Sequence, residues 1–177
     1  YRIGSGAYVP PRIDRLPINA SAANTLADLG IWRWGAGRRD PPPDVRLPED
    51  ATPLGAALGE DIVLEGYTLD RDGDVWTVDL YWHTTALPQD DLLIFIHATV
   101  GDAIPVQWDG PPNDGQTPTW SWWPGYGVRT THTLRLSEPP DALYAGLYSY
   151  PSLARLSAVI DGQRAPDDRI LLWTKAQ

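Results

Sequence analysis

The segment WTVDLYWH, residues 76–83, places a large apolar side chain at every second position. Successive side chains of an extended chain point to opposite sides, so this spacing gives the segment one continuous apolar face. The residues on this face are Trp76, Val78, Leu80 and Trp82, and those on the other face are Thr77, Asp79, Tyr81 and His83. The pattern predicts a β-strand packed on one side against a hydrophobic core.

Similar segments continue toward the C-terminus at the spacing of about 8–12 residues that is typical of sandwiches and barrels. The predicted strands are 62–69, 76–83, 92–99, 104–108, 128–136, 143–150, 154–160 and 170–173. The segment 92–99 is nearly all apolar, as expected for a central strand buried on both faces. No long helix is predicted between these strands, and parallel sheets need crossover helices. We therefore expect an all-β protein, an antiparallel two-sheet β-sandwich with jelly-roll or immunoglobulin-like connections.

Residues 1–57 differ from the rest of the chain because they are rich in proline, including the run Pro41-Pro42-Pro43. Proline fixes φ and removes a hydrogen-bond donor, which favours extended and poorly paired backbone. We expect an extended Pro-rich N-terminal arm or juxtamembrane linker over residues 1–57, followed by the β-sandwich domain over residues 58–177. A short helix is expected within the arm at residues 19–29, closed by Gly30.

The composition excludes several classes of partner. The chain carries 14 Lys and Arg residues against 23 Asp and Glu residues, for a net charge of −9, which disfavours nucleic acid and anionic membrane surfaces. No run reaches the roughly 18–20 apolar residues of a membrane span, so we expect no direct membrane insertion. The absence of cysteine excludes disulfides and thiolate metal sites. Because the chain begins at Tyr1 and lacks methionine, we expect it to be part of a longer protein.

An aromatic segment, TWSWWPGY at residues 119–126, is the strongest candidate for ligand contact. Exposed aromatic rings stack on the C–H faces of sugars, and they also carry large burial energy in cores and at protein interfaces. The candidate contact residues are Trp120, Trp122, Trp123 and Tyr126. Alternation indicates that at least one of the tryptophans fills the end of the sandwich core.

The segment Asp70-Arg71-Asp72-Gly73-Asp74 allows two interpretations. Three alternating carboxylates beside a glycine resemble the opening of a calcium loop, which makes Asp70, Asp72 and Asp74 candidate metal ligands. The full loop also needs a glutamate about seven residues after Asp74, and none is present there. The other interpretation is a hairpin turn, because Asp-Gly between two strands is a strong hairpin signal.

Other residue types give no catalytic constellation. The three histidines, His83, His97 and His132, all fall in predicted strands, where a hydrogen-bonded core histidine is commoner than a metal ligand. The adjacent acid pairs are Glu60 with Asp61, Asp90 with Asp91, and Asp167 with Asp168. Neighbouring residues of an extended chain point apart, whereas glycoside-hydrolysing carboxylates converge across a cleft of about 5–10 Å. We expect no catalytic residue and no cofactor within this chain.

Several short segments together resemble a known family. They are LGEDIVLEGY at 58–67, Gly73-Asp74, Leu80-Tyr81-Trp82, Phe95-Ile96-His97, QWDGPP at 107–112, Pro118-Thr119, Trp123-Pro124-Gly125 and Gly146-Leu147-Tyr148. Their order is similar to that in an extracytoplasmic β-sandwich domain found at the C-terminus of bacterial (Chloroflexi-type) multi-spanning membrane glycosyltransferases. These enzymes are of the dolichyl-phosphate-mannose mannosyltransferase-like class. The resemblance covers about residues 54–173.

The resemblance implies a non-catalytic accessory domain, because the catalytic carboxylates of that family lie in the membrane-embedded portion. It also implies a location on the extracytoplasmic face of the bacterial membrane and contact with the membrane-embedded part of the parent protein. On this hypothesis the aromatic segment contacts glycan acceptors. The alternative is a structural or protein–protein interaction domain that binds no glycan.

Overall fold

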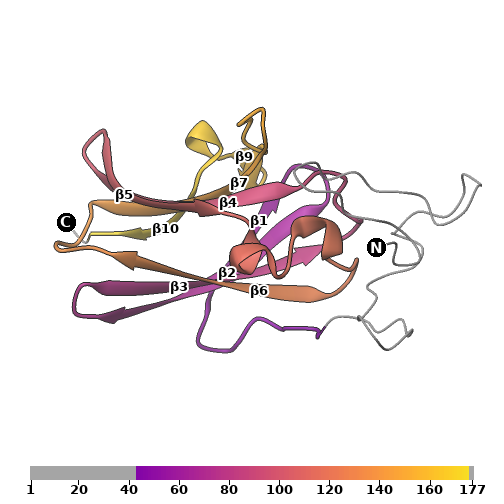
Figure 1. Ribbon diagram of the computed structural model, residues 1–177, viewed down its shortest axis with the longest axis horizontal. Coiled ribbons are helices and arrows are strands. Elements are labelled where there is room, and N and C mark those ends of the chain that lie inside the picture. Colours follow the sequence, from indigo (N-terminus) through magenta and orange to yellow (C-terminus); the bar gives the residue numbers. More distant parts are fainter. Residues whose placement is uncertain (1–42, 176–177) are drawn as a thin grey trace, which may run out of the picture. The chain divides into compact units, whose positions relative to one another are not determined.

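A computed structural model describes residues 43–175 of the chain and shows two antiparallel β-sheets packed face to face (Figure 1). The larger sheet has the strand order β6-β3-β2-β1-β8-β9, and the smaller sheet has the order β10-β7-β4-β5. The larger sheet contains β1 (Thr52–Leu58), β2 (Ile62–Asp72), β3 (Val75–Thr84), β6 (Gly127–Arg135), β8 (Ala158–Ile160) and β9 (Gln163–Arg164). The smaller contains β4 (Leu92–Val100), β5 (Ala103–Gly110), β7 (Ala142–Ser149) and β10 (Ile170–Thr174). The predicted all-β sandwich is confirmed.

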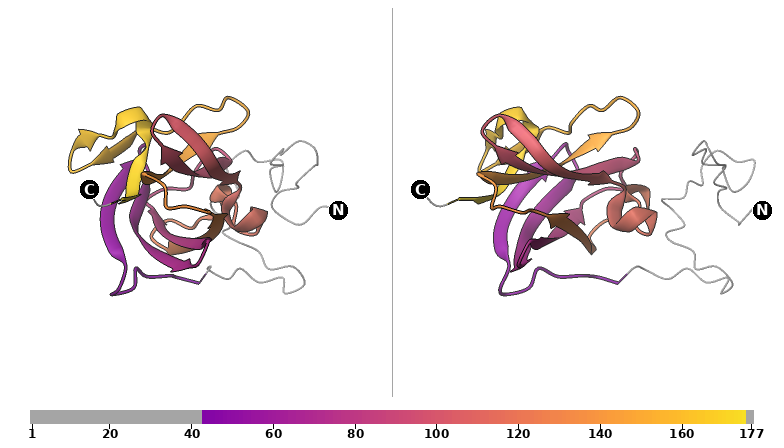
Figure 2. Two further views of the ribbon diagram at one scale, coloured as in Figure 1. Left: turned by 90° about the vertical axis from the view of Figure 1, so that its left-hand side faces the viewer. Right: turned by 60° about the vertical axis from the view of Figure 1, so that its left-hand side comes forward.

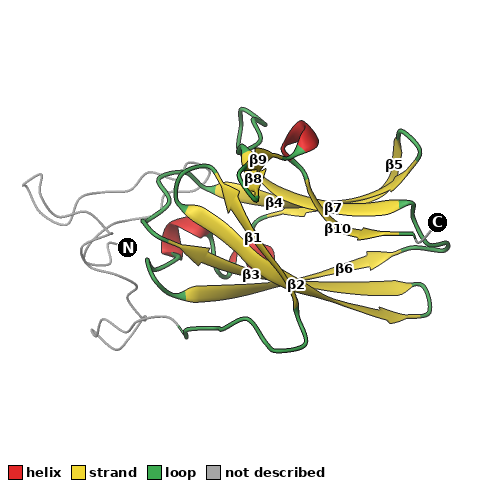
Figure 3. Ribbon diagram, turned by 180° about the vertical axis from the view of Figure 1, so that it is seen from behind, coloured by secondary structure: helices red, strands yellow, loops and turns green. Residues whose placement is uncertain are grey.

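Helical structure in the described part of the chain is limited to three short 3₁₀ turns (Figure 3). They are η1 (Pro112–Gly115), η2 (Thr119–Ser121) and η3 (Pro166–Asp168). Within residues 43–175, no helix has the length and apolar character that a membrane crossing requires. The connections between strands are therefore turns and loops, as antiparallel neighbours allow.

The predicted strand at 76–83 lies within β3 and shows the expected alternation in burial. Its partner across the sheet is β6, with Trp76 opposite Leu134 and Trp82 opposite Val128. Trp76 and Trp82 are each only 1% exposed, and both belong to the hydrophobic core. Figure 2 shows the two sheets that enclose this core from two further sides. The apolar spacing of this segment thus fixes which face of the larger sheet is buried.

Contacts across the interior join the two sheets. The Trp76 ring in β3 meets the Trp173 ring in β10 edge to face, with the ring centroids 5.1 Å apart. The Tyr67 hydroxyl in β2 donates a hydrogen bond to the carbonyl oxygen of Leu172 in β10. An edge-to-face aromatic pair stabilises the fold beyond the burial of its apolar area. The hydrogen bond of the Tyr67 hydroxyl offsets the free-energy cost of removing that hydroxyl from water.

The sandwich begins earlier than the sequence predicts. The sequence predicts residues 52–57 to be part of the arm, but they form most of β1, which lies between β2 and β8 in the larger sheet. Pro53 and a bulge at Gly55, whose φ is +61°, interrupt the strand pattern that would have revealed β1. The predicted strand at 154–160 is also shorter, since β8 covers only Ala158–Ile160. Residues 1–42, with the helix expected at 19–29, lie outside the described residues.

Residues 43–51, here called the strap, precede β1 and are tied to the larger sheet. The amide of Val45 donates to the Gly127 carbonyl at 3.0 Å, and the Gly127 amide donates to the Asp44 carboxylate at 2.9 Å. A Cβ atom at position 127 would lie 1.8 Å from the Val45 carbonyl oxygen, so only glycine permits this approach. The strap therefore hydrogen-bonds to the first residue of β6, which is the edge strand of the larger sheet.

A polar network crosses the apolar core near the edge formed by β6. The Trp82 indole donates to the Thr130 hydroxyl at 2.9 Å, and the His132 Nε2 atom lies 2.8 Å from the same hydroxyl. The His132 ring, 1% exposed, packs against the Trp108 ring at 4.2 Å. Burial lowers the pKa of His132 to about 4, because the charged imidazolium would lose its hydration.

We expect the substitution His132→Gln to reduce the loss of stability on acidification. The unfolded chain protonates this histidine near pH 6.5 and the folded chain only near pH 4, so folding is favoured above pH 6.5 and weakened as the pH falls. Between about pH 7.5 and about pH 5, His132 costs the native protein ~2 kcal/mol of unfolding free energy. Urea unfolding at the two pH values measures this cost. The control is His83→Gln, a partly exposed position; an unchanged pH dependence in His132→Gln would contradict the assignment.

Candidate functional site

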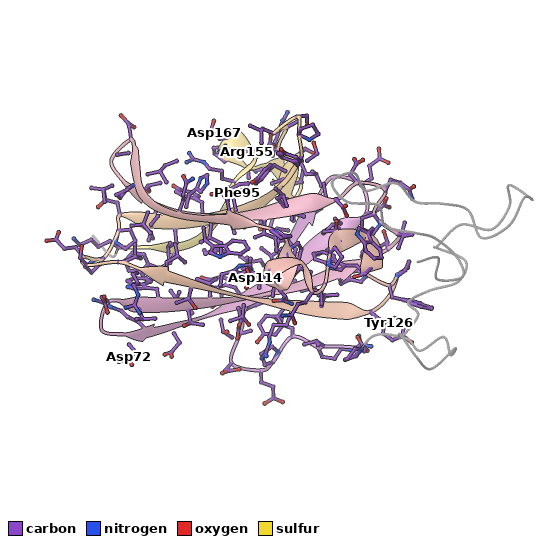
Figure 4. The ribbon with its side chains drawn as sticks, in the orientation of Figure 1. Asp72, Phe95, Asp114, Tyr126, Arg155 and Asp167 are labelled. Carbon is purple, nitrogen blue, oxygen red and sulfur yellow. The ribbon has the colours of Figure 1, made fainter. Side chains whose placement is uncertain are left out.

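The aromatic end loop, residues 116–126, joins η1 to β6 and contains the four candidate contact residues. Tyr126 lies at the end of the sandwich opposite Asp72 (Figure 4). The backbone forms the η2 turn and then one further turn, at Pro124 and Gly125, before it enters β6 at Gly127. The four aromatic side chains do not share one environment.

Trp122 belongs to the hydrophobic core. It is 1% exposed, its ring centroid lies 5.8 Å from that of Trp82, and its indole donates to the Thr117 carbonyl at 2.9 Å. The expectation that at least one loop tryptophan fills the end of the core is confirmed. The prediction that Trp122 contacts a ligand is wrong, because no face of its ring is accessible.

Buried hydrogen bonds fix the loop around Trp122. The fully buried Thr119 hydroxyl donates to the Asp90 carbonyl at 2.9 Å and accepts from the Leu92 amide at 2.9 Å. The Gly125 amide donates to the Thr84 carbonyl at 2.8 Å. These bonds join the loop to the ends of β3 and β4, so the position of the loop is set by both sheets.

The other three aromatic residues are partly exposed. Trp123 and Tyr126 form an edge-to-face pair, with ring centroids 6.1 Å apart and planes inclined at 67°. The Tyr126 amide donates to the Trp123 carbonyl at 3.0 Å, which holds the two residues together. Trp120 is half-buried in the same loop. The surface therefore offers inclined rings rather than a coplanar platform.

The three candidate calcium ligands lie in the β2–β3 hairpin. Asp70 and Asp72 are in β2, and Asp72 pairs with Val75 across a turn made by Gly73 and Asp74. Asp74 forms an ion pair of 3.6 Å with Arg135. Across residues 43–175, no group of three His, Asp or Glu side chains is placed to hold a metal ion. The hairpin interpretation is confirmed, and the geometry does not form the calcium site.

The histidines and acid pairs are likewise dispersed. His83 lies 3.7 Å from Glu65, whereas His97 lies 3.5 Å from Asp109 and His132 is in the core. Of the acid pairs, Glu60-Asp61 lies between β1 and β2, Asp90-Asp91 between β3 and β4, and Asp167-Asp168 in η3. Each pair thus occupies a separate loop.

Polar and aromatic side chains gather on the outer face of the smaller sheet. This outer-face cluster comprises Phe95 and His97 in β4, Asp109 in β5, Tyr148 in β7 and Arg155 in the following segment. The rings of Phe95 and His97 lie 4.7 Å apart, and the Arg155 guanidinium lies 4.9 Å above the Phe95 ring. Phe95 and Arg155 lie together above the smaller sheet (Figure 4).

Burial governs the protonation of this cluster. His97 is 7% exposed, and its pKa is lowered by burial and by the positive charge of Arg155, although the Asp109 carboxylate opposes the shift. Burial raises the pKa of Asp109, with His97, Arg155 and Tyr148 opposing the change. The pKa of Tyr148 is raised by burial and by the neighbouring Asp109 carboxylate. At neutral pH His97 is therefore uncharged beside an ionised Asp109.

Residues that follow β7 cover part of the cluster. Arg155 donates to the Asp167 carbonyl at 3.0 Å, and Arg169 pairs with the Asp167 carboxylate at 2.8 Å. Gly146 allows this packing, because a Cβ atom there would lie 2.4 Å from the Phe95 ring and 3.2 Å from the Asp168 carbonyl oxygen. The glycine thus permits the Phe95 ring to lie across β7.

Local sequence patterns do not predict this cluster. His97 lies in a strand of apolar residues, where a core histidine is the common outcome, and its neighbours come from other strands. The register that places Asp109 opposite Phe95 cannot be read from spacing alone. Three of the segments that carried the resemblance, around Phe95, Asp109 and Tyr148, nevertheless meet here. Comparisons with protein-family models, with curated proteins and with solved structures find no match to this chain.

We expect Trp122→Ala to destabilise the protein by about 3–5 kcal/mol, because it opens a cavity in the core and removes a hydrogen bond. The matched substitution Trp123→Ala, in the same loop, should cost less than half as much, since the Trp123 ring is partly in solvent. Urea unfolding followed by circular dichroism compares the two variants. Equal losses, or a larger loss for Trp123→Ala, would show that Trp122 does not fill the core.

Proposed function

We propose that this chain is a non-catalytic accessory domain of a membrane glycosyltransferase that holds glycan acceptors on the extracytoplasmic side of the membrane. The partly exposed rings of Trp120, Trp123 and Tyr126 make the contact. The resemblance of the sequence segments supports the parent enzyme and the location. The geometry of the aromatic end loop supports the binding role.

The observation that carries the proposal is the fixed position of this loop. Trp122 anchors the loop in the core, and Thr119 bonds it to the β3–β4 connection and the start of β4. Aromatic rings held in this way lose little conformational entropy when a ligand binds.

The strap contacts Gly127, the residue that follows Tyr126, so it lies beside the aromatic end loop. The dispersed acid pairs favour binding over hydrolysis, which needs converging carboxylates.

A protein partner is the second candidate for the same surface. The 67° angle between the Trp123 and Tyr126 rings favours it, because a coplanar pair would suit a run of sugar rings better. A single pyranose can still stack on one indole face. The test below therefore uses saccharides directly.

We expect Trp123→Ala to weaken saccharide binding by about five- to tenfold, since loss of one stacked ring costs roughly 1–1.4 kcal/mol. Tryptophan fluorescence and calorimetry with a panel of mannose-, glucose- and N-acetylglucosamine-containing oligosaccharides measure the affinity. The control is Tyr150→Ala, which removes a ring that is 70% exposed in another loop. No response of the native protein across the panel would reject the glycan role and leave the protein partner.

A further inference from the structure

We propose that the outer-face cluster is a second binding site, for a neutral polyhydroxylated ligand such as a saccharide unit, with Asp109, Tyr148 and Arg155 as its contact residues. His97 and Arg169 act as positioning residues beneath them. This site lies on a sheet face, whereas the aromatic end loop lies at the end of the sandwich. The proposed binding at the aromatic end loop and the proposed binding at the outer-face cluster depend on different residues, so an experiment can reject either one without the other.

The contact residues bring complementary hydrogen-bonding groups to one place. The Asp109 side chain is 28% exposed and supplies only acceptors, while Arg155 is exposed and uses one of its five N–H groups on Asp167. The Tyr148 hydroxyl lies near enough to the Asp109 carboxylate for that carboxylate to raise the pKa of the phenol. A carboxylate and a guanidinium side by side suit adjacent hydroxyl groups, each of which both donates and accepts.

The charge of the cluster favours a neutral ligand over an anion. The groups that face it are the cations Arg155 and Arg169 and the anions Asp109 and Asp167, with His97 uncharged. Asp168 also interacts with Arg155, and it pairs with Arg164 at 2.7 Å. The three positive and three negative charges cancel. A phosphate or carboxylate would meet the Asp109 charge at close range, and a cation would meet the two guanidinium groups.

Two buried polar atoms of the cluster have no hydrogen-bond partner in the described part of the chain. Their donor and acceptor chemistry also favours a hydroxylated ligand over an anion. The Nε2 atom of His97 faces the Asp109 carboxylate, so it carries the proton and leaves Nδ1 as an acceptor. The Arg169 Nε atom is a donor, also buried and without a partner. Both atoms are enclosed, so a ligand can act on them only through a water molecule; a water bound to a ligand hydroxyl can donate to Nδ1, whereas an anion supplies only acceptors.

The aromatic side chains supply the apolar part of the site. The Tyr148 ring is half-buried and lies 6.3 Å from the Phe95 ring, which is itself 1% exposed. Phe95 is held from below by Gly146 and from above by Arg155. The exposed part of the Tyr148 ring is therefore fixed beside the polar groups, which is the arrangement that binds the C–H face and the hydroxyls of one sugar ring.

The experiment uses the three histidines as reporters. In protein labelled with ¹³C at the histidine rings, the Cε1–H signals of His83, His97 and His132 are followed during titration with methyl α-mannopyranoside, maltotriose and diacetylchitobiose. Inorganic phosphate is the anionic probe. We expect a saturable shift of the His97 signal with at least one saccharide, no shift of His132, and no response to phosphate.

The variants separate this site from the aromatic end loop. Asp109→Asn and Arg155→Lys should each weaken the His97 response by about tenfold, because the first removes an anionic acceptor and the second removes the planar fork of donors. The control Asp79→Asn, on the other sheet, should leave it unchanged. An unshifted His132 signal in each free variant shows that the core is intact.

Three results would overturn the inference. They are the absence of a saccharide response at His97, a response to phosphate alone, and a response that Trp123→Ala abolishes but Asp109→Asn does not. The last result would support the aromatic end loop and reject the outer-face cluster. Loss of the response in Asp109→Asn but not in Trp123→Ala would support the cluster, whatever the fate of the proposed function.

Discussion

The contact between Trp82 and Trp122 is the interaction on which the rest of this structure depends. Trp82 lies near the end of β3 on the apolar face of the larger sheet, and Trp122 comes from a surface loop some forty residues later, yet their ring centroids lie 5.8 Å apart. The contact closes one end of the sandwich core and ties the aromatic end loop to it. A ring that stabilises the fold thus also fixes Trp123 and Tyr126, which adjoin it on the surface. The packing of Trp122 on Trp82 therefore affects both the stability of the fold and the position of the candidate binding surface.

Strand β4 has a comparable double role. Its inward residues, such as Ile94 and Ile96, are fully buried in the core, while Phe95 and His97 face outward and are nearly as buried. A strand covered on both sides holds its side chains rigidly, which suits a cluster of aromatic and ionisable groups. Burial of His97 keeps that ring neutral, and burial of His132 does the same inside the core. The two histidines differ in their neighbours, since only His97 has a carboxylate beside it.

The sequence predicted the sheet fold well because period-two spacing reports directly on burial, as at Trp76 to Trp82. It missed β1, where Pro53 and the bulge at Gly55 break the spacing. At the aromatic end loop, composition could not tell the buried Trp122 from the partly exposed Trp123, since that difference depends on how the loop packs on Trp82. The outer-face cluster could not be predicted from the sequence, because only the pairing of β4 with β5 and β7 brings His97, Asp109 and Tyr148 together. Local patterns predict strands, whereas sites made by several strands need the pairing between them.

Hydrogen exchange of the Trp122 indole N–H tests most directly whether the aromatic end loop is part of the core. The native protein should exchange this proton only through global unfolding, with the same free energy of opening as the central amides of β3 and β4. The indole signal is resolved from backbone amides in a ¹H–¹⁵N spectrum, so both values come from one denaturant series. Exchange through a local opening of much lower free energy, insensitive to denaturant, would show that the loop moves independently of the sandwich and would contradict the account.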